Sequence, residues 1–192
     1  MSHQRVQVGD KAHDFDFQTP CSPRQKFHET MGNNPAILVF LRYQGCPVCQ
    51  MEMAHLKREI GLFTQKETKV FVFLQSSPET VASAANEADW PFHIVCDPQG
   101  AIFQEYAVEP GGILKYLHPA GMIAAIKAVS QGFRHGKFEG KETQLPAAFA
   151  VNSMKIITYA YYGKHISDLP SPATLAETGS PEKLPLITIP GQ

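Results

Sequence analysis

The cysteines at positions 46 and 49, separated by Pro47 and Val48, are the feature that most constrains this chain. They follow a continuous apolar run at residues 36–41 and a short turn, and they begin a segment with helical periodicity. A C-x-x-C pair between a strand and a helix is typical of a redox dithiol. Pro47 suits the first helical position, where an N–H would have no partner in any case.

The place of Cys46 at the expected start of the helix has a chemical consequence. Unpaired backbone N–H groups and the helix dipole stabilise an anion there. Such a position lowers the pKa of a cysteine from about 8.5 to roughly 3.5–7.5. Residues three apart in a first helical turn lie near each other on one face, so Cys49 falls close to Cys46. We therefore expect an activated thiolate at Cys46.

The remaining cysteines argue against a metal centre. A structural zinc site at the pair would need two further ligands, and the sequence has no second C-x-x-C or C-x-x-H. Cys96 ends an apolar run and fits a core position. Cys21 lies beside Pro20 in an expected loop, where a surface thiol and a second redox partner both remain open. We expect no metal ligands.

Length and charge exclude several classes of protein. The 192 residues suit one decorated domain, and the formal net charge is -1, with no basic stripe. Neither nucleic acid nor a membrane is therefore expected as a partner, and no apolar run approaches the ~18 residues of a membrane span. The N-terminus has no apolar stretch of the signal-peptide kind. We expect a cytoplasmic protein, because C-x-x-C pairs in a reducing compartment are more often catalytic or metal-binding than structural.

Alternating apolar segments predict an α/β fold. Strands are expected at three apolar runs and in a C-terminal hairpin, at residues 36–41, 69–75, 92–96, 147–151 and 155–160. Helices are expected from Cys46, from Pro78 and over residues 113–130, the last divided near Pro119. Such alternation implies a mostly parallel sheet covered on both faces, made mixed by the hairpin. Residues 132–144 are expected to form a surface loop.

The segment at residues 40–49, Phe-Leu-Arg-Tyr-Gln-Gly-Cys-Pro-Val-Cys, resembles the peroxiredoxin-like branch of the thioredoxin superfamily, the alkyl hydroperoxide reductase/thiol-specific antioxidant type. The resemblance extends through residues 97–100 to residues 144–149. It implies a thioredoxin-like domain at residues 1–170, with a mixed central sheet flanked by helices and a helical insert, followed by a Pro-rich C-terminal tail at residues 171–192. Pro146 matches a family proline, which implies a cis Leu145–Pro146 bond facing the cysteines.

The resemblance also implies a reaction. Cys46 would be the exposed nucleophile that attacks a peroxide oxygen or a disulfide sulfur, and Cys49 would lie deeper and resolve it as a Cys46–Cys49 disulfide. An external thiol reductant, such as a thioredoxin or glutathione system, would reopen the disulfide without a further cofactor. A homodimer is compatible with the resemblance. The alternative is a non-catalytic thioredoxin-fold module that senses redox state or binds a partner.

Three positions depart from the family pattern. Tyr43 stands where the family has a threonine, Val39 stands where it has a proline, and no arginine precedes the strand at Phe149. Arg42 is a candidate to replace that arginine, because a guanidinium can stabilise a thiolate or an oxyanion. Tyr43 can bond a sulfur, line a substrate groove or pack in the core. We therefore take Arg42, Tyr43, Pro47 and Pro146 as candidate support residues for the cysteine pair.

Overall fold

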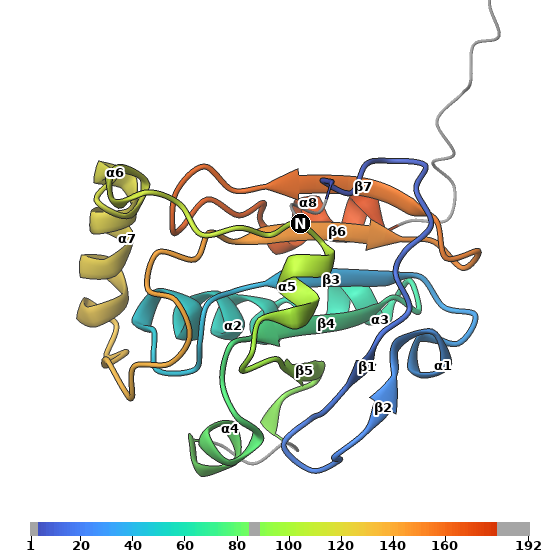
Figure 1. The fold of residues 1–192 in the computed structure, drawn as a ribbon, viewed down its shortest axis with the longest axis horizontal. Helices are drawn as coiled ribbons and strands as arrows, with labels where there is room; N and C mark the ends of the chain where they lie inside the picture. The colour runs from blue at the N-terminus through green and yellow to red at the C-terminus, as the bar shows by residue number, and fades with distance from the viewer. Residues whose placement is uncertain (1–3, 85–88, 180–192) are drawn as a thin grey trace, which may run out of the picture.

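The apolar runs form one five-stranded mixed sheet in the computed structural model, which describes residues 4–84 and 89–179 (Figure 1). The strand order is β5-β4-β3-β6-β7, with bounds His93–Cys96, Lys69–Leu74, Ala36–Phe40, Ala147–Val151 and Ile157–Tyr162. The first three strands of this order run parallel, and the last two form the expected antiparallel hairpin. The predicted α/β class with a mixed central sheet is confirmed.

Two layers cover the sheet. One contains α2 (Pro47–Arg58), α3 (Gly61–Thr64), α4 (Pro78–Ala84) and α8 (Pro172–Thr178). The other contains the small hairpin of β1 (Asp16–Phe17) and β2 (Gln25–Lys26), followed by α1 (Phe27–Met31) and α5 (Ala101–Glu105). The helical segment after α5 is divided at Pro119, as predicted, into α6 (Ile113–Tyr116) and α7 (Pro119–Ser130), and α7 packs against α2.

Strand β3 is buried on both faces, which explains its unbroken apolar sequence. Successive side chains point to opposite faces, so Ile37 and Val39 pack under α2 while Leu38 and Phe40 face the other layer. The Phe40 ring stacks on Phe73 of the neighbouring strand with centroids 4.1 Å apart. This central strand carries the chain directly to Arg42 and the cysteine pair.

The expected tail at residues 171–192 differs from the structure in its first part. Ser171 caps α8 by accepting the Thr174 N–H at 3.2 Å, and Pro172 takes the first helical position. Leu175 and Ala176 are buried in the core beneath the sheet. Residues 171–178 therefore belong to the folded domain because they supply apolar surface to it. Residues 180–192 lie outside the described residues.

Candidate active site

Cys46 is the N-cap of α2, at the place where the chain turns from the end of β3 into the helix. Its Sγ accepts the backbone N–H of Cys49 at 3.2 Å, so the sulfur does the work of a capping oxygen. Pro47 follows at the first helical position, as its sequence context predicts. The expectation that Cys46 is exposed was wrong. Its exposed fraction is 0% and that of Cys49 is 3%, whereas Cys21 is the exposed cysteine.

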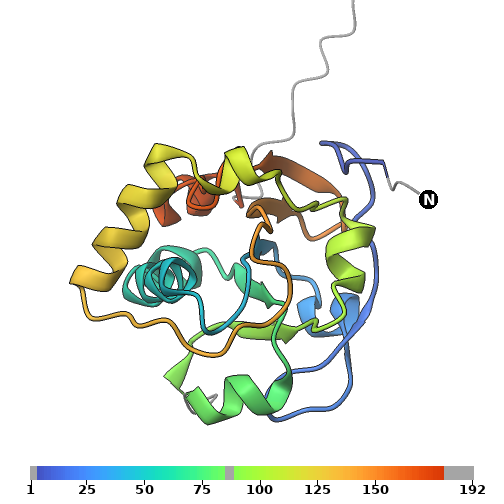
Figure 2. The ribbon, with the colours of Figure 1, turned by 60° about the vertical axis from the view of Figure 1, so that its left-hand side comes forward.

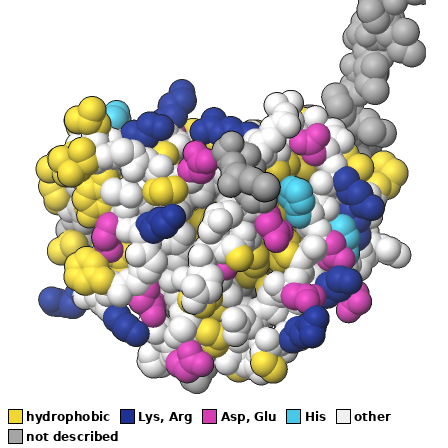
Figure 3. Space-filling view, in the orientation of Figure 1, with side chains coloured by type: hydrophobic (Ala, Val, Ile, Leu, Met, Phe, Trp, Pro, Cys, Tyr) yellow, Lys and Arg dark blue, Asp and Glu magenta, His cyan; other side chains and the backbone are white. Residues whose placement is uncertain are grey.

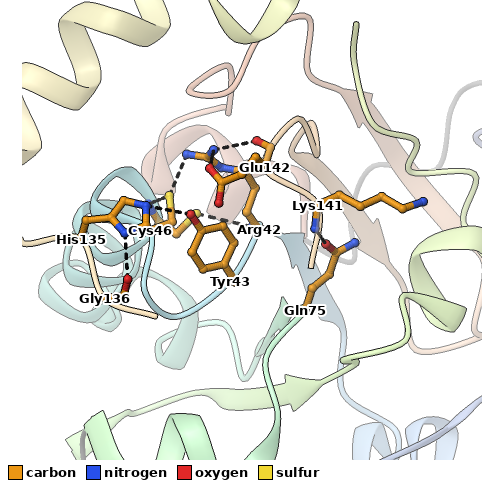
Figure 4. A network of polar contacts seen from close by, with 9 residues as sticks. Arg42, Tyr43, Cys46, Gln75, His135, Gly136, Lys141 and Glu142 are labelled. Atoms are coloured by element: carbon orange, nitrogen blue, oxygen red, sulfur yellow. Dashed lines mark hydrogen bonds and ion pairs between the residues drawn. The ribbon is translucent and has the colours of Figure 1, made fainter. Parts of the chain in front are cut away.

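Arg42 donates hydrogen bonds to both sulfurs of the pair, and Figure 4 shows the contact of its side chain with Cys46. Its side-chain Nη2 lies 2.8 Å from Cys46 Sγ, and its backbone N–H lies 3.4 Å from Cys49 Sγ. The side chain is 6% exposed, so this contact is shielded from water. A charged donor at this distance favours the thiolate form of its partner. The structure thus brings Arg42 to the position where a thiolate or a developing oxyanion needs a donor.

A second set of contacts holds the guanidinium in place. Arg42 Nη1 donates to the backbone oxygen of Glu142 at 2.8 Å and lies 3.7 Å from the carboxylate of the same residue. The Tyr43 and Tyr116 rings lie 5.9 Å and 5.8 Å from the guanidinium carbon. Within the described chain, Glu142 Oε1 is buried without a hydrogen-bond partner. Arg42 is therefore clamped between a thiol and a carboxylate that come from distant parts of the sequence.

The pKa values of Cys46 and Cys49 depend on each other. Burial raises the pKa of Cys46 well above its ordinary value, and its hydrogen bond to Cys49 adds to the increase. Burial also opposes a charge on Cys49, but the hydrogen bond from Cys46 and the guanidinium of Arg42 prevail and lower the pKa of Cys49 to about 7. Of the two thiols, Cys49 therefore has the lower pKa. The expected fall in the pKa of Cys46 itself is not found, because that expectation assumed an exposed helix start.

Tyr43 is fully buried, and its hydroxyl lies 2.9 Å from Nε2 of His135. Burial raises the pKa of Tyr43, and the nearby Glu142 carboxylate raises it further, so the phenol stays protonated at neutral pH. The sequence left three roles open for Tyr43: bonding a sulfur, lining a substrate groove and packing. Its contacts favour packing, and they attach the loop at residues 131–146 to the site. Tyr43 joins the turn before Cys46 to that loop.

That covering loop, residues 131–146, is called the strap here. It runs from the end of α7 past α2 toward β6 (Figure 2). Gly136 N–H donates to the Gly45 carbonyl at 2.8 Å, and Gln50 Nε2 donates to the Arg134 carbonyl at 3.2 Å. Farther along, the Lys141 N–H donates to Gln75 Oε1 at 2.8 Å. The sequence predicted a surface loop at residues 132–144. It did not predict that this loop covers the cysteines.

His135 and Glu142 are the strap residues that sequence reasoning did not single out as part of the site. His135 Nδ1 lies 2.8 Å from its neighbour's carbonyl, Gly136 O, and its other nitrogen faces Tyr43. The glycine at position 136 is the one sequence feature that relates to this contact. In the structure a Cβ at Gly136 would lie 3.1 Å from Gly45 Cα. Such close backbone approach favours glycine, but nothing local in the sequence identifies the partner.

Pro146 lies at the start of β6, and the bond before it is trans. The expected cis bond was wrong. The Pro146 carbonyl accepts the Gly163 N–H at 2.8 Å, which continues the pairing of β6 with β7 one step beyond Ala147 and Tyr162. A trans bond carries the extended backbone directly into that ladder, and trans is the preferred state of an X-Pro bond.

A cavity of about 580 Å³ lies on the far side of the strap, between α5 and the ends of β4 and β5. Its polar lining includes Gln75, Gln104, Lys141 and Gln144, and neither Cys46 nor Cys49 lines it. This cavity therefore does not adjoin Cys46. The described residues contain no cluster of three His, Cys, Asp or Glu side chains that could hold a metal ion.

Adding a methyl group at Gly45 is expected to displace the strap. The new Cβ would lie 2.3 Å from the Lys137 carbonyl oxygen, a backbone atom that cannot rotate away. Losing one or two strap hydrogen bonds, at ~1 kcal/mol each, would raise the opening population about tenfold. In a Cys21→Ser background, Gly45→Ala should therefore speed the reaction of the pair with a bulky disulfide reagent about tenfold. Gly61→Ala is the matched control, since nothing lies within 4 Å of its Cβ. An unchanged rate would mean that the strap does not limit access.

Comparisons with known proteins agree with this geometry. The sequence matches the AhpC/TSA family over residues 8–160, which is most of the chain. The chain belongs to the AhpC/TSA family. Members of this family are thiol-dependent peroxidases and oxidoreductases, and the chain is an enzyme of this kind. Among curated proteins, the search found no significant match.

Solved structures show the shared fold at low sequence identity. The peroxidoxin BcpB of Mycobacterium tuberculosis superposes with a TM-score of 0.64 at 14% identity, covering 91% of this chain and 94% of its own. A thiol peroxidase from Chromobacterium violaceum gives 0.58 at 13% identity, covering 91% and 87%. A yeast mitochondrial 1-Cys peroxiredoxin gives 0.56 at 14% identity, covering 82% and 68%. These likenesses support the thioredoxin-like, peroxiredoxin-like fold.

Proposed function

We propose that this AhpC/TSA protein reduces hydroperoxides with Cys46 as the attacking sulfur and Cys49 as the resolving sulfur. The observation that carries the proposal is the convergence of two donors, Arg42 Nη2 and the Cys49 N–H, on Cys46 Sγ. The same donors can stabilise negative charge on that sulfur and on an oxygen brought against it. Cys49 is one helical turn away, and its lowered pKa suits the role of resolving thiolate.

The chemistry begins with a proton transfer inside the pair. The Cys46 proton passes to the Cys49 thiolate, and the Cys46 thiolate attacks the terminal oxygen of the hydroperoxide. The O–O bond breaks, the sulfur is oxidised to a sulfenic acid, and the leaving alkoxide takes the proton back from Cys49, which yields the alcohol and restores the Cys49 thiolate. Cys49, as its thiolate, then attacks Cys46 Sγ, forming the disulfide and releasing hydroxide, which is protonated to water.

An external thiol completes the cycle by reducing the disulfide, with two electrons passing from the donor to the pair. A thioredoxin or glutathione system in the cytoplasm is the donor class we propose, and the yeast peroxiredoxin above is described as resolved by glutathione/thioredoxin systems. No helix of the described residues is long and apolar enough to cross a membrane. A protein disulfide remains the alternative oxidant, because the same pair can attack a sulfur in place of an oxygen.

Peptide mapping after oxidation tests the residue roles. Treating the reduced protein with one equivalent of hydroperoxide should yield a disulfide between Cys46 and Cys49, while Cys21 and Cys96 remain outside it. Cys49→Ser should stop at the sulfenic acid on Cys46, which dimedone traps. A disulfide that joins Cys46 to Cys21 or Cys96, or a dimedone adduct on another residue, would contradict the assignment. One stoichiometric oxidation without turnover of an external thiol would instead support the redox-sensing alternative.

A further inference from the structure

The surface of α6 and α7 exposes an unusual number of large apolar side chains. We call this surface the α6–α7 face; its members are Ile113, Leu114, Leu117, Met122, Ile123, Ile126 and Val129. Each is at least half exposed, and Leu114 reaches 84%. Hydrophobic side chains gather over these two helices in the space-filling view (Figure 3). An apolar patch of this kind marks an interaction site.

In helix α7 the small residues face the core and the large apolar residues face outward, which is the reverse of the usual arrangement in a surface helix. Its small residues face inward, with Ala124 and Ala125 against the core and Ala128 fully buried. Gly121 also faces inward, since a Cβ there would lie 2.6 Å from Ile166. The large residues at positions 122, 126 and 129 recur at spacings of four and three and face outward. The helix packs closely through its small side and leaves its large apolar side for another surface.

The chain segment that carries the α6–α7 face contains cationic residues and no acidic ones. Residues 111–138 contain Lys115, Lys127, Arg134 and Lys137 and no aspartate or glutamate. All four cations are exposed. Two acidic groups lie nearby: Glu139 pairs with Lys137 at 3.6 Å, and Glu52 on α2 interacts with Lys127. The positive charge favours an anionic partner over a second copy of the same face, which would set cation against cation.

We propose that the α6–α7 face docks on lipid bilayers that contain anionic phospholipids. The apolar side chains enter the interface between headgroups and acyl chains, and the four cations contact the phosphates, as in other amphipathic surface helices. From the sequence we predicted no membrane partner, because the net charge of the whole chain is -1. That sum hides the cationic segment, because acidic residues elsewhere in the chain cancel it.

The α6–α7 face adjoins the cysteine site. Tyr116, within α6, places its ring 5.8 Å from the guanidinium carbon of Arg42. Phe138 on the strap is 68% exposed and packs on His135 with ring centroids 4.0 Å apart. Docking would therefore bring the strap to the bilayer. Resting on the proposed peroxidase function, this placement makes hydroperoxides of membrane acyl chains the substrate class that docking delivers.

Vesicle flotation of the full chain tests the docking without reference to activity. The protein should float with phosphatidylcholine vesicles that contain phosphatidylglycerol, remain behind with pure phosphatidylcholine, and dissociate at high salt. The Lys115→Gln, Lys127→Gln double variant should bind about thirtyfold more weakly. Ile123→Asn with Ile126→Asn should abolish binding; both residues are exposed, so circular dichroism should not change. Lys57→Gln and Val8→Ser, exposed elsewhere, are the matched controls.

Other outcomes would overturn the docking. One is the absence of flotation; another is equal flotation with neutral vesicles. A third is a dimer in solution that Ile126→Asn converts to a monomer without any vesicle binding, which would make the face an interface between copies.

Peroxidase assays separate the substrate claim from the proposed function. The Ile123→Asn, Ile126→Asn variant should lose activity on a phospholipid hydroperoxide in anionic vesicles and keep activity on soluble tert-butyl hydroperoxide. Equal loss on both substrates, or on neither, would overturn the substrate class. Vesicle binding by a protein inactive with every hydroperoxide would leave the docking intact and reject the peroxidase.

Discussion

Cys46→Ser is expected to lower peroxidase turnover at least about 10³-fold, because removing a covalent nucleophile leaves only binding and electrostatic effects. The serine hydroxyl is a far weaker nucleophile than a thiolate and cannot accept an oxygen atom from a peroxide. Turnover should be followed as consumption of an external thiol with hydroperoxide as acceptor. The serine can still cap α2 by accepting the Cys49 N–H, so the fold should be retained.

Cys21→Ser is the matched control for this loss. Cys21 is exposed and distant in sequence from the pair, and its replacement should leave turnover unchanged. A Cys46→Ser variant that retains turnover, or a Cys21→Ser variant that loses it, would refute the assignment of Cys46. Loss in Cys49→Ser with dimedone labelling intact would separate the resolving step from the attack.

Arg42→Met is expected to lower kcat/KM about 10²–10³-fold, the usual loss when one donor to a developing oxyanion is removed. The side chain provides the 2.8 Å contact to Cys46. Its positive charge, together with the larger effect of the hydrogen bond from Cys46, lowers the pKa of Cys49 against the opposing effect of burial. Without that charge the thiolate is less stable, so the pKa of the pair rises. At neutral pH less thiolate is present, and the rate profile should move to higher pH.

The pH profile distinguishes this role from a merely structural one. Arg42→Lys keeps the charge but loses the fork that also reaches the Glu142 carbonyl, so it should preserve the pH profile better than Arg42→Met while lowering the rate. Arg58→Met, at the exposed end of α2, is the matched control and should change neither quantity. A uniform rate loss in Arg42→Met with an unmoved pH profile would mean that Arg42 does not stabilise the thiolate.

Local patterns in the sequence determined much of the fold. The unbroken apolar run at residues 36–41 predicted the buried central strand, and Pro47 after Cys46 predicted where α2 begins. The break at Pro119 predicted the division of α6 from α7. These features follow from the conformational limits and burial of single residues and their near neighbours, so they can be read without knowing the rest of the chain.

Only the tertiary structure decided how the site is assembled. Arg42 meets Glu142 across 100 positions of sequence, and Tyr43 meets His135 across 92, so no local pattern could reveal either contact. In the folded chain Cys46 is buried, and this burial is the main influence on its pKa. The sequence alone determined that a dithiol stands at the start of a helix. Whether it is exposed, which charge faces it and which thiol holds the proton depended on segments that meet only in the folded chain.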